Sequence, residues 1–116
     1  RASNILLLVD SEDDLFLFNY ARTRLGEQSM TIRICFINEQ VDKQLQSRIM
    51  NDFVQIDPHK FVLDKPLTMN TFIENKETLL VMSYTTCEKL SKDQELFAKL
   101  PSLLIIRPRQ LKVEKI

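Results

Sequence analysis

Glycine is almost missing from this chain, because Gly26 is the only glycine among its 116 residues. A loop that cradles phosphate groups needs glycines, since only a residue without a Cβ atom lets the backbone turn tightly and approach the phosphates. The chain therefore contains neither a Walker A loop nor a glycine-rich dinucleotide fingerprint. Gly26 itself follows a helical pattern of apolar residues, which predicts that it ends a helix.

Other features are also scarce, and each scarcity excludes a class of protein. Two cysteines, Cys35 and Cys87, are too few for a disulfide framework and favour a reducing, cytosolic environment. No apolar run approaches the roughly 18 residues that span a bilayer, so we expect a soluble domain. Sixteen basic residues balance sixteen acidic ones, which argues against a nucleic-acid partner.

The chain does contain a regular alternation of apolar runs and helical patterns. Its 44% hydrophobic and 28% charged residues fit one globular domain over residues 1–108, followed by a polar tail at 109–116. Continuous apolar runs are typical of parallel strands that are buried on both faces. Such runs predict strands at 4–9, 31–37, 60–63, 78–82 and 102–106.

Apolar residues at helical spacing connect these runs. Leu17, Ala21 and Leu25 repeat every four residues, and Ser11 with Asp14 forms a weak version of a capping box before them. The remaining helices are expected at roughly 40–55, around 69–73, and from a cap at Thr85 or Thr86 to Leu100.

The resulting element order, βαβαβαβαβ, predicts the fold. Crossovers of this length require parallel neighbouring strands and place helices on both faces of the sheet. Connections of this kind are right-handed, which leaves few topologies. We therefore expect a single-domain α/β protein with an open, doubly wound, Rossmann-like sheet of five mainly parallel strands.

The carboxyl ends of the strands are the expected binding edge, because open α/β sheets bind ligands there, at the switch in strand order. Asp10 follows the first strand, Asn38 the second, and a hydroxyl cluster at 83–86 the fourth. A structural role is the alternative for each, since side chains at helix starts are most often caps. The candidate ligand-binding residues are Asp10, Asn38, Ser83, Thr85 and Thr86.

These residues suggest different chemistries. The Asp10 carboxylate is suited to accept hydrogen bonds from a base or ribose, and hydroxyls at a helix start are suited to hold one phosphate or sulfate. Asp10 with Glu12, Asp13 and Asp14 offers oxygen ligands for a divalent cation. An acidic first helical turn is equally explained by the helix dipole, so we predict neither a metal nor a cofactor.

No set of residues predicts catalysis. Cys87 lies in a first helical turn, where a thiolate is stabilised, but no histidine accompanies it nearby in sequence. Cys35 fits a buried core thiol, and His59 fits an exposed loop beside Pro58. Because no acid/base pair or nucleophile set is recognisable, the chain is not expected to be an enzyme.

Three stretches resemble the universal stress protein family, and together they cover nearly the whole chain in order and spacing. They are NILLLVDSEDD at 4–14, FVLDKPLTMNTFIENKETLLVMS at 61–83 and PSLLIIRP at 101–108. The resemblance implies a Rossmann-like fold and matches Asp10 to an aspartate on the adenine side of the nucleotide. Nucleotide-binding members carry a Gly-x-x-Gly-(nine residues)-Gly-Ser/Thr loop, whereas this chain has Ser83 and Thr86 where the first two glycines belong.

Degenerate domains of this kind occur at the cytoplasmic C-terminus of bacterial monovalent cation/proton antiporters, and this chain is similar to them. The resemblance implies a non-catalytic regulatory or sensor domain on the cytoplasmic side of the inner membrane. Its partner would be the rest of a membrane transporter. It would act by binding a small molecule or nucleotide, or by pairing with a second copy through an edge strand.

Two alternatives stay open. The first is a free-standing universal stress protein that binds adenine nucleotides weakly through Asp10. The second is a degenerate response-regulator receiver, in which Asp64 is the phosphoacceptor and Ser83 and Arg107 take the places of the hydroxyl and lysine. Arginine donates hydrogen bonds differently from lysine, and the interval from Asp64 to the fourth strand is short for a receiver.

Overall fold

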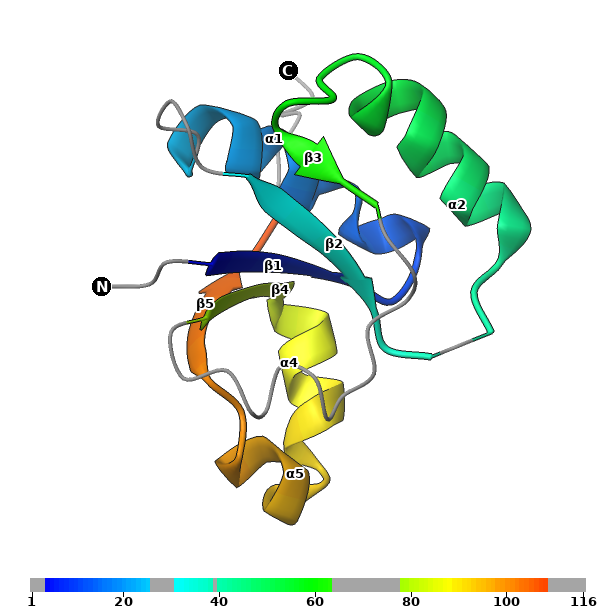
Figure 1. Cartoon of the computed structure of the whole chain (residues 1–116). Coiled ribbons are helices and arrows are strands. Elements are labelled where there is room, and N and C mark those ends of the chain that lie inside the picture. Colours follow the sequence, from blue (N-terminus) through cyan, green and yellow to red (C-terminus); the bar gives the residue numbers. More distant parts are fainter. Residues whose placement is uncertain (1–3, 26–30, 39, 64–77, 109–116) are drawn as a thin grey trace, which may run out of the picture.

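The computed structural model describes residues 4–25, 31–38, 40–63 and 78–108. Within these ranges one sheet has five strands, all parallel, in the order β3-β2-β1-β4-β5. The expected open, doubly wound α/β fold is confirmed, with every described strand parallel (Figure 1). The strands are β1 (Asn4–Val9), β2 (Ile32–Phe36), β3 (Phe61–Val62), β4 (Thr78–Ser83) and β5 (Ser102–Ile106).

The central strand β1 shows why a continuous apolar run marks the middle of the sheet. Successive side chains of a strand point to opposite faces. Leu7 and Val9 pack into the core on one face, and Leu6 and Leu8 pack into the core on the other. A polar residue at any of these positions would be buried without a partner, so the strand has to be apolar on both faces.

The first face is covered by the helices that follow β1 and β2 (Figure 1). These are a 3-10 turn η1 (Glu12–Asp14), helix α1 (Phe16–Arg24), helix α2 (Lys43–Ile49) and its π-helical continuation η2 (Met50–Val54). Phe18 of α1 is fully buried between Phe53 and Phe61, with ring centroids 4.3 and 5.3 Å away. This aromatic group joins α1, η2 and β3, and so fixes the position of α2 over the sheet.

The second face is covered by α4 (Tyr84–Ser91) and α5 (Gln94–Ala98). The single helix expected from Thr85 or Thr86 to Leu100 is wrong at both its start and its middle. Ser83 is the N-cap of α4, and its hydroxyl accepts from Thr86 N. Asp93 accepts from Leu96 N and starts α5 as a separate helix, because an aspartate that caps a new helix takes extended backbone angles.

The helix expected after the first strand begins differently from the prediction. Ser11 caps a 3-10 turn, and Asp14 completes a capping box with it, as its spacing indicates. The regular α-helix starts only at Phe16. Four expectations lie outside the described residues: the role of Gly26, the site at Asp64, the helix near 69–73 and the tail at 109–116.

The strand order reverses at β1. The chain runs from β1 to β2 and β3 on one side, and then places β4 and β5 on the other. The carboxyl ends of β1 and β4 therefore flank the switch point, where open α/β sheets bind ligands. In the part of the chain that the structure describes, no helix has the length and apolar character to cross a bilayer.

Candidate functional site

A buried carboxylate, Asp14, lies at the switch point and is only 3% exposed. One of its oxygens, Oδ1, accepts a hydrogen bond from the Ser83 hydroxyl at 2.6 Å. The other, Oδ2, accepts from the backbone amides of Asp10 at 2.7 Å and Ser11 at 3.2 Å. The loop after β1 is thereby joined to the end of β4 through one side chain.

Thr86 completes this arrangement, which we call the polar cluster (Asp14, Ser83 and Thr86). The Thr86 hydroxyl lies 3.4 and 3.3 Å from the two Asp14 oxygens and 3.0 Å from the Ser83 hydroxyl. The Thr86 amide donates to the Ser83 hydroxyl at 3.1 Å, and both Ser83 and Thr86 are 2% exposed. An amide at the start of α4 that a bound phosphate would use is therefore already occupied, with a carboxylate beside it.

Asp10 lies next to the polar cluster but forms a different contact. Its Oδ2 accepts from Lys89 Nζ of α4 at 3.0 Å, and its side chain is 20% exposed. The alternative expected for Asp10, a structural cap at the helix start, is wrong, because the Ser11 hydroxyl accepts from Asp13 N and Asp10 contacts Lys89 instead. Asp10 thus adds a second, more exposed link between β1 and α4.

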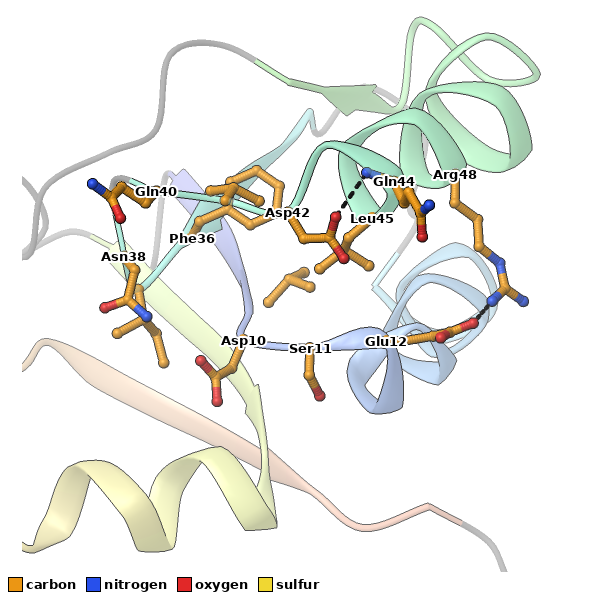
Figure 2. A pocket seen from close by; sticks show the side chains of 13 residues that line it. Asp10, Ser11, Glu12, Phe36, Asn38, Gln40, Asp42, Gln44, Leu45 and Arg48 are labelled. Carbon is orange, nitrogen blue, oxygen red and sulfur yellow. Dashed lines mark hydrogen bonds and ion pairs between the residues drawn. The ribbon is translucent and has the colours of Figure 1, made fainter.

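A pocket of about 310 Å³ lies on the other side of Asp10, between the ends of β1 and β2 and the start of α2 (Figure 2). Its apolar lining comes mainly from Val9, Phe36, Val41 and Leu45. The first two are the last residues of their strands, and the other two lie four residues apart at the start of the helix expected at roughly 40–55. Its polar rim consists of Asp10, Ser11, Glu12, Asn38, Gln40, Asp42, Gln44 and Arg48.

The structure divides the five candidate binding residues into three groups. Asp10 and Asn38 line the pocket. Ser83 and Thr86 are buried in the polar cluster, out of reach of a ligand in the pocket. Thr85 is exposed on α4 and does not line this pocket. A single site that uses all five is therefore not formed.

Sequence reasoning missed the α2 side of the pocket. Asp42 caps α2 through a 2.9 Å bond from Gln44 N, and Arg48 forms an ion pair with Glu12 and lies 3.6 Å from Asp52. The Asp42 cap was visible as an aspartate two residues before Gln44. The Arg48–Glu12 pair had no sequence signal, because the two residues meet only when α2 packs beside η1.

Burial removes both thiols from consideration as nucleophiles. Cys35 is fully buried, and burial raises its pKa to about 12, while nearby Arg33 opposes the shift weakly. Burial also raises the pKa of Cys87, which corrects the expectation that its place in α4 stabilises a thiolate. Desolvation disfavours the charged form of a thiol. His59 is exposed, as expected.

The acidic residues of the first turn, which were considered as ligands for a divalent cation, lie in different surroundings. Asp14 is buried in the polar cluster, whereas Glu12 contacts Arg48 and Asp13 is exposed. Among the described residues, no group of three His, Cys, Asp or Glu side chains is placed to hold a metal ion. The acidic residues of this turn therefore act separately.

Comparison with known proteins assigns no family to the chain. No protein-family model matches it, and no similar curated protein or solved structure was found. The resemblance to universal stress proteins therefore stays a prediction that depends on the residues quoted for it. What is established is the architecture: an α/β domain with a parallel, doubly wound sheet, a polar cluster at its switch point and a pocket beside it.

Proposed function

We propose that this domain is a non-catalytic regulatory module of a monovalent cation/proton antiporter, on the cytoplasmic side of the inner membrane. The observation that carries the regulatory part is the polar cluster. Asp14, Ser83 and Thr86 form hydrogen bonds with one another at the position where a nucleotide-binding relative would hold phosphates. The antiporter part is supported by the family resemblance alone.

The polar cluster disfavours polyphosphate for two reasons. The Thr86 amide donates to Ser83, so it has no proton left for a phosphate oxygen. The Asp14 carboxylate adds a negative charge beside the same helix start. Near a protein surface, two like charges about 4 Å apart repel by roughly 4 kcal/mol.

The burial of the candidate nucleophiles supports a role without catalysis. Ser83, Thr86 and Cys35 are at most 2% exposed, and Cys87 is 7% exposed. A raised pKa keeps both thiols protonated at neutral pH. A substrate would have to open the core to reach any of these groups.

Regulation would require that a ligand or a second copy of the domain binds one transporter state more tightly than another. The structure offers two surfaces for such binding. One is the pocket beside Asp10, and the other is β5, which lies at the edge of the sheet. Binding at either surface would be transmitted to the membrane part of the transporter through the sheet.

Isothermal titration with ATP and Mg²⁺ tests the loss of polyphosphate binding. We expect no saturable binding up to about 1 mM, which corresponds to a binding free energy of about −4 kcal/mol. A micromolar dissociation constant would contradict the proposal and support the free-standing, nucleotide-binding alternative. Incubation with acetyl phosphate tests the receiver alternative, with Asp64→Asn as the control for any phosphoryl adduct seen by mass spectrometry.

The transporter context has its own test. The reading frame that encodes these residues should also encode several membrane-spanning segments. Cation/proton exchange should then be measured in everted membrane vesicles with the full-length protein and with a deletion of residues 1–108. We expect the deletion to shift the pH or cation concentration of half-maximal exchange. Unchanged exchange, or a frame without membrane spans, would refute this part of the proposal.

A further inference from the structure

We propose that the pocket beside Asp10 binds a small organic cation, with an ammonium group attached to an apolar body. This inference rests on the proposed regulatory function and names the class of ligand that would act in it. The pocket has a volume of about 310 Å³, at the lower end of the range of roughly 300–1,000 Å³ for small-molecule sites. Its residues come from the carboxyl edge of the sheet and from α2.

The apolar lining of the pocket is the reason for proposing a ligand with an apolar body. Val9 and Phe36 are at most 2% exposed and Leu45 is 8% exposed, so they form the floor of the pocket and offer a ligand little accessible surface. The accessible apolar surface comes mainly from Ile37 and Val41, which also line the pocket and are partly exposed. A small hydrocarbon group placed against these two side chains would lose part of its contact with water.

The carboxylates on the rim of the pocket are the reason for proposing a positively charged ligand. It carries three carboxylates, at Asp10, Glu12 and Asp42, and one cation, Arg48. The charge of Arg48 is compensated, because its guanidinium contacts Glu12 and lies 3.6 Å from Asp52. The charge of Asp10 is compensated by Lys89 at 3.0 Å. Asp42 is the rim carboxylate for which no basic partner is found among the described residues, and its charge attracts a cation and repels phosphates and carboxylates.

Two carboxylate oxygens are open to a ligand. Asp42 uses Oδ1 to accept from Gln44 N, and Asp10 uses Oδ2 to accept from Lys89. No described residue donates a hydrogen bond to the remaining oxygen of either side chain. Figure 2 shows Asp42 and Asp10 on opposite sides of the pocket, with Asn38 at one end between them. Because the two carboxylates lie on opposite sides of the pocket, an ammonium group would donate to one of them, and Asp42 is the one whose charge is not paired with a lysine.

Three probes that share one phenyl ring test the inference: phenethylamine, 2-phenylethanol and 3-phenylpropionate. Each is titrated into the ¹⁵N-labelled chain, and dissociation constants are taken from amide chemical shifts. We expect phenethylamine to bind at least about tenfold more tightly than phenylpropionate, because the interaction with the rim carboxylate changes from attraction to repulsion. The shifts should be centred on Val9, Asn38 and Leu45.

A matched pair of variants tests whether the charge of Asp42 contributes to the binding of phenethylamine. Asp42→Asn keeps the α2 cap, because asparagine is also a good cap, but removes one rim charge. We expect it to weaken phenethylamine about threefold and leave phenylethanol unchanged. Asp93→Asn makes the same change at the cap of α5 on the other face, and should change neither affinity.

Several outcomes would overturn the inference. They are equal affinity for the three probes, no saturable binding of phenethylamine at about 10 mM, shifts centred away from the pocket, or tighter binding of adenosine than of phenethylamine. These outcomes leave the loss of polyphosphate binding untouched, because that claim fails only if ATP binds. The two failures are thus distinguishable in one set of titrations.

Discussion

Asp14 joins the two halves of the sheet through hydrogen bonds from Ser83 and from the amides of Asp10 and Ser11. Burying a carboxylate costs free energy unless hydrogen bonds compensate for the lost water. Its partners provide that compensation, and the amides of Asp10 and Ser11 would lose their acceptor if the carboxylate were removed. The Ser83 hydroxyl would still have the Thr86 hydroxyl at 3.0 Å. A single residue therefore controls the geometry of the switch point.

Asp14→Ala should lower the free energy of unfolding by about 3 kcal/mol, since it leaves buried donors without an acceptor. Asp13→Ala is the control, because Asp13 is exposed and its carboxylate accepts no hydrogen bond from the described residues. The control should change stability by less than about 0.5 kcal/mol. Urea unfolding followed by circular dichroism measures both, and equal losses would show that the Asp14 contacts contribute little.

Cys35 predicts a loss of stability at alkaline pH. Its pKa rises from 9.0 to about 12 in the folded protein, so the folded state holds the thiol proton more tightly than the unfolded chain. The stabilisation is complete below pH 9.0 and is lost as the pH rises toward 12, by up to about 1.4 kcal/mol per pH unit.

The measurement is urea unfolding between about pH 8 and 11 for the wild type and for Cys35→Ala. The variant should be less stable overall but should lose stability less steeply as the pH rises. All other titrating groups are shared, so the difference in slope reports Cys35. Identical slopes would mean that the thiol ionises equally in both states.

At the scale of elements, the helix starts carry most of the local specificity. Among the described α-helices, three have side-chain caps, and the surroundings of these caps differ: α2 at Asp42, α4 at Ser83 and α5 at Asp93. The cap of α4 is buried and shared with Asp14, whereas Asp42 and Asp93 are exposed. A buried cap that is shared with another element, such as Ser83, fixes its helix against the rest of the fold. An exposed cap orders only the first turn of its own helix.

Ser83→Ala should therefore cost more than Asp93→Ala. We expect a loss of about 2–3 kcal/mol for Ser83→Ala, because both a cap and a donor to Asp14 disappear. The Asp93→Ala change removes only an exposed cap and should cost about 1 kcal/mol. Thermal or urea unfolding measures both changes. If Asp93→Ala proved the more costly, the shared role of Ser83 would be wrong.

Most of the strands and helices could be predicted from the sequence, and the exceptions have identifiable causes. Apolar runs located every described strand to within one residue at each end. Burial on both faces explains this for the central strand β1, whereas the edge strand β5 is apolar although it is only partly buried. The break between α4 and α5 was missed, since apolar residues continue at helical spacing across Asp93. A capping aspartate in the middle of a helical pattern was the available signal.

At the scale of the molecule, the edge strand β5 has protective residues only outside its own span, at Pro101, Arg107 and Pro108. β5 lies at the end of the strand order, and Ser102–Ile106 contains neither proline nor a charged residue. Ile105 is 43% exposed. Natural edge strands usually carry charges, prolines or bulges that prevent pairing with another chain. This absence supports the expectation that two copies pair.

We expect the chain to dimerise and Ile105→Lys to raise the dimer dissociation constant about tenfold, equivalent to about 1.4 kcal/mol. Ile56→Lys is the control, because Ile56 is 69% exposed and lies after η2, which covers the sheet on the β2 side. Sedimentation equilibrium over a range of concentrations gives the constants. A monomeric wild type, or an equal effect of both variants, would rule out pairing through β5.

The candidate site was only partly predictable. The strand ends placed Asp10, Asn38 and Ser83 at the carboxyl edge of the sheet, and all three lie there. Their separation into a buried cluster and an open pocket depends on Asp14, which the sequence suggested as a helix cap or a cation ligand and not as a partner of Ser83. Arg48 was not foreseen, because its contact with Glu12 spans two helices.

The amino-acid sequence by itself determined the architecture, since apolar runs, helical spacing and parallel crossovers allow few arrangements of five strands. It also determined that no glycine-rich loop grips phosphate. Only the tertiary structure decided which polar groups compensate one another and which face a pocket. The physical reason is that hydrogen bonds such as Ser83 to Asp14 join residues far apart in the chain, so their partners are chosen by packing and not by local composition.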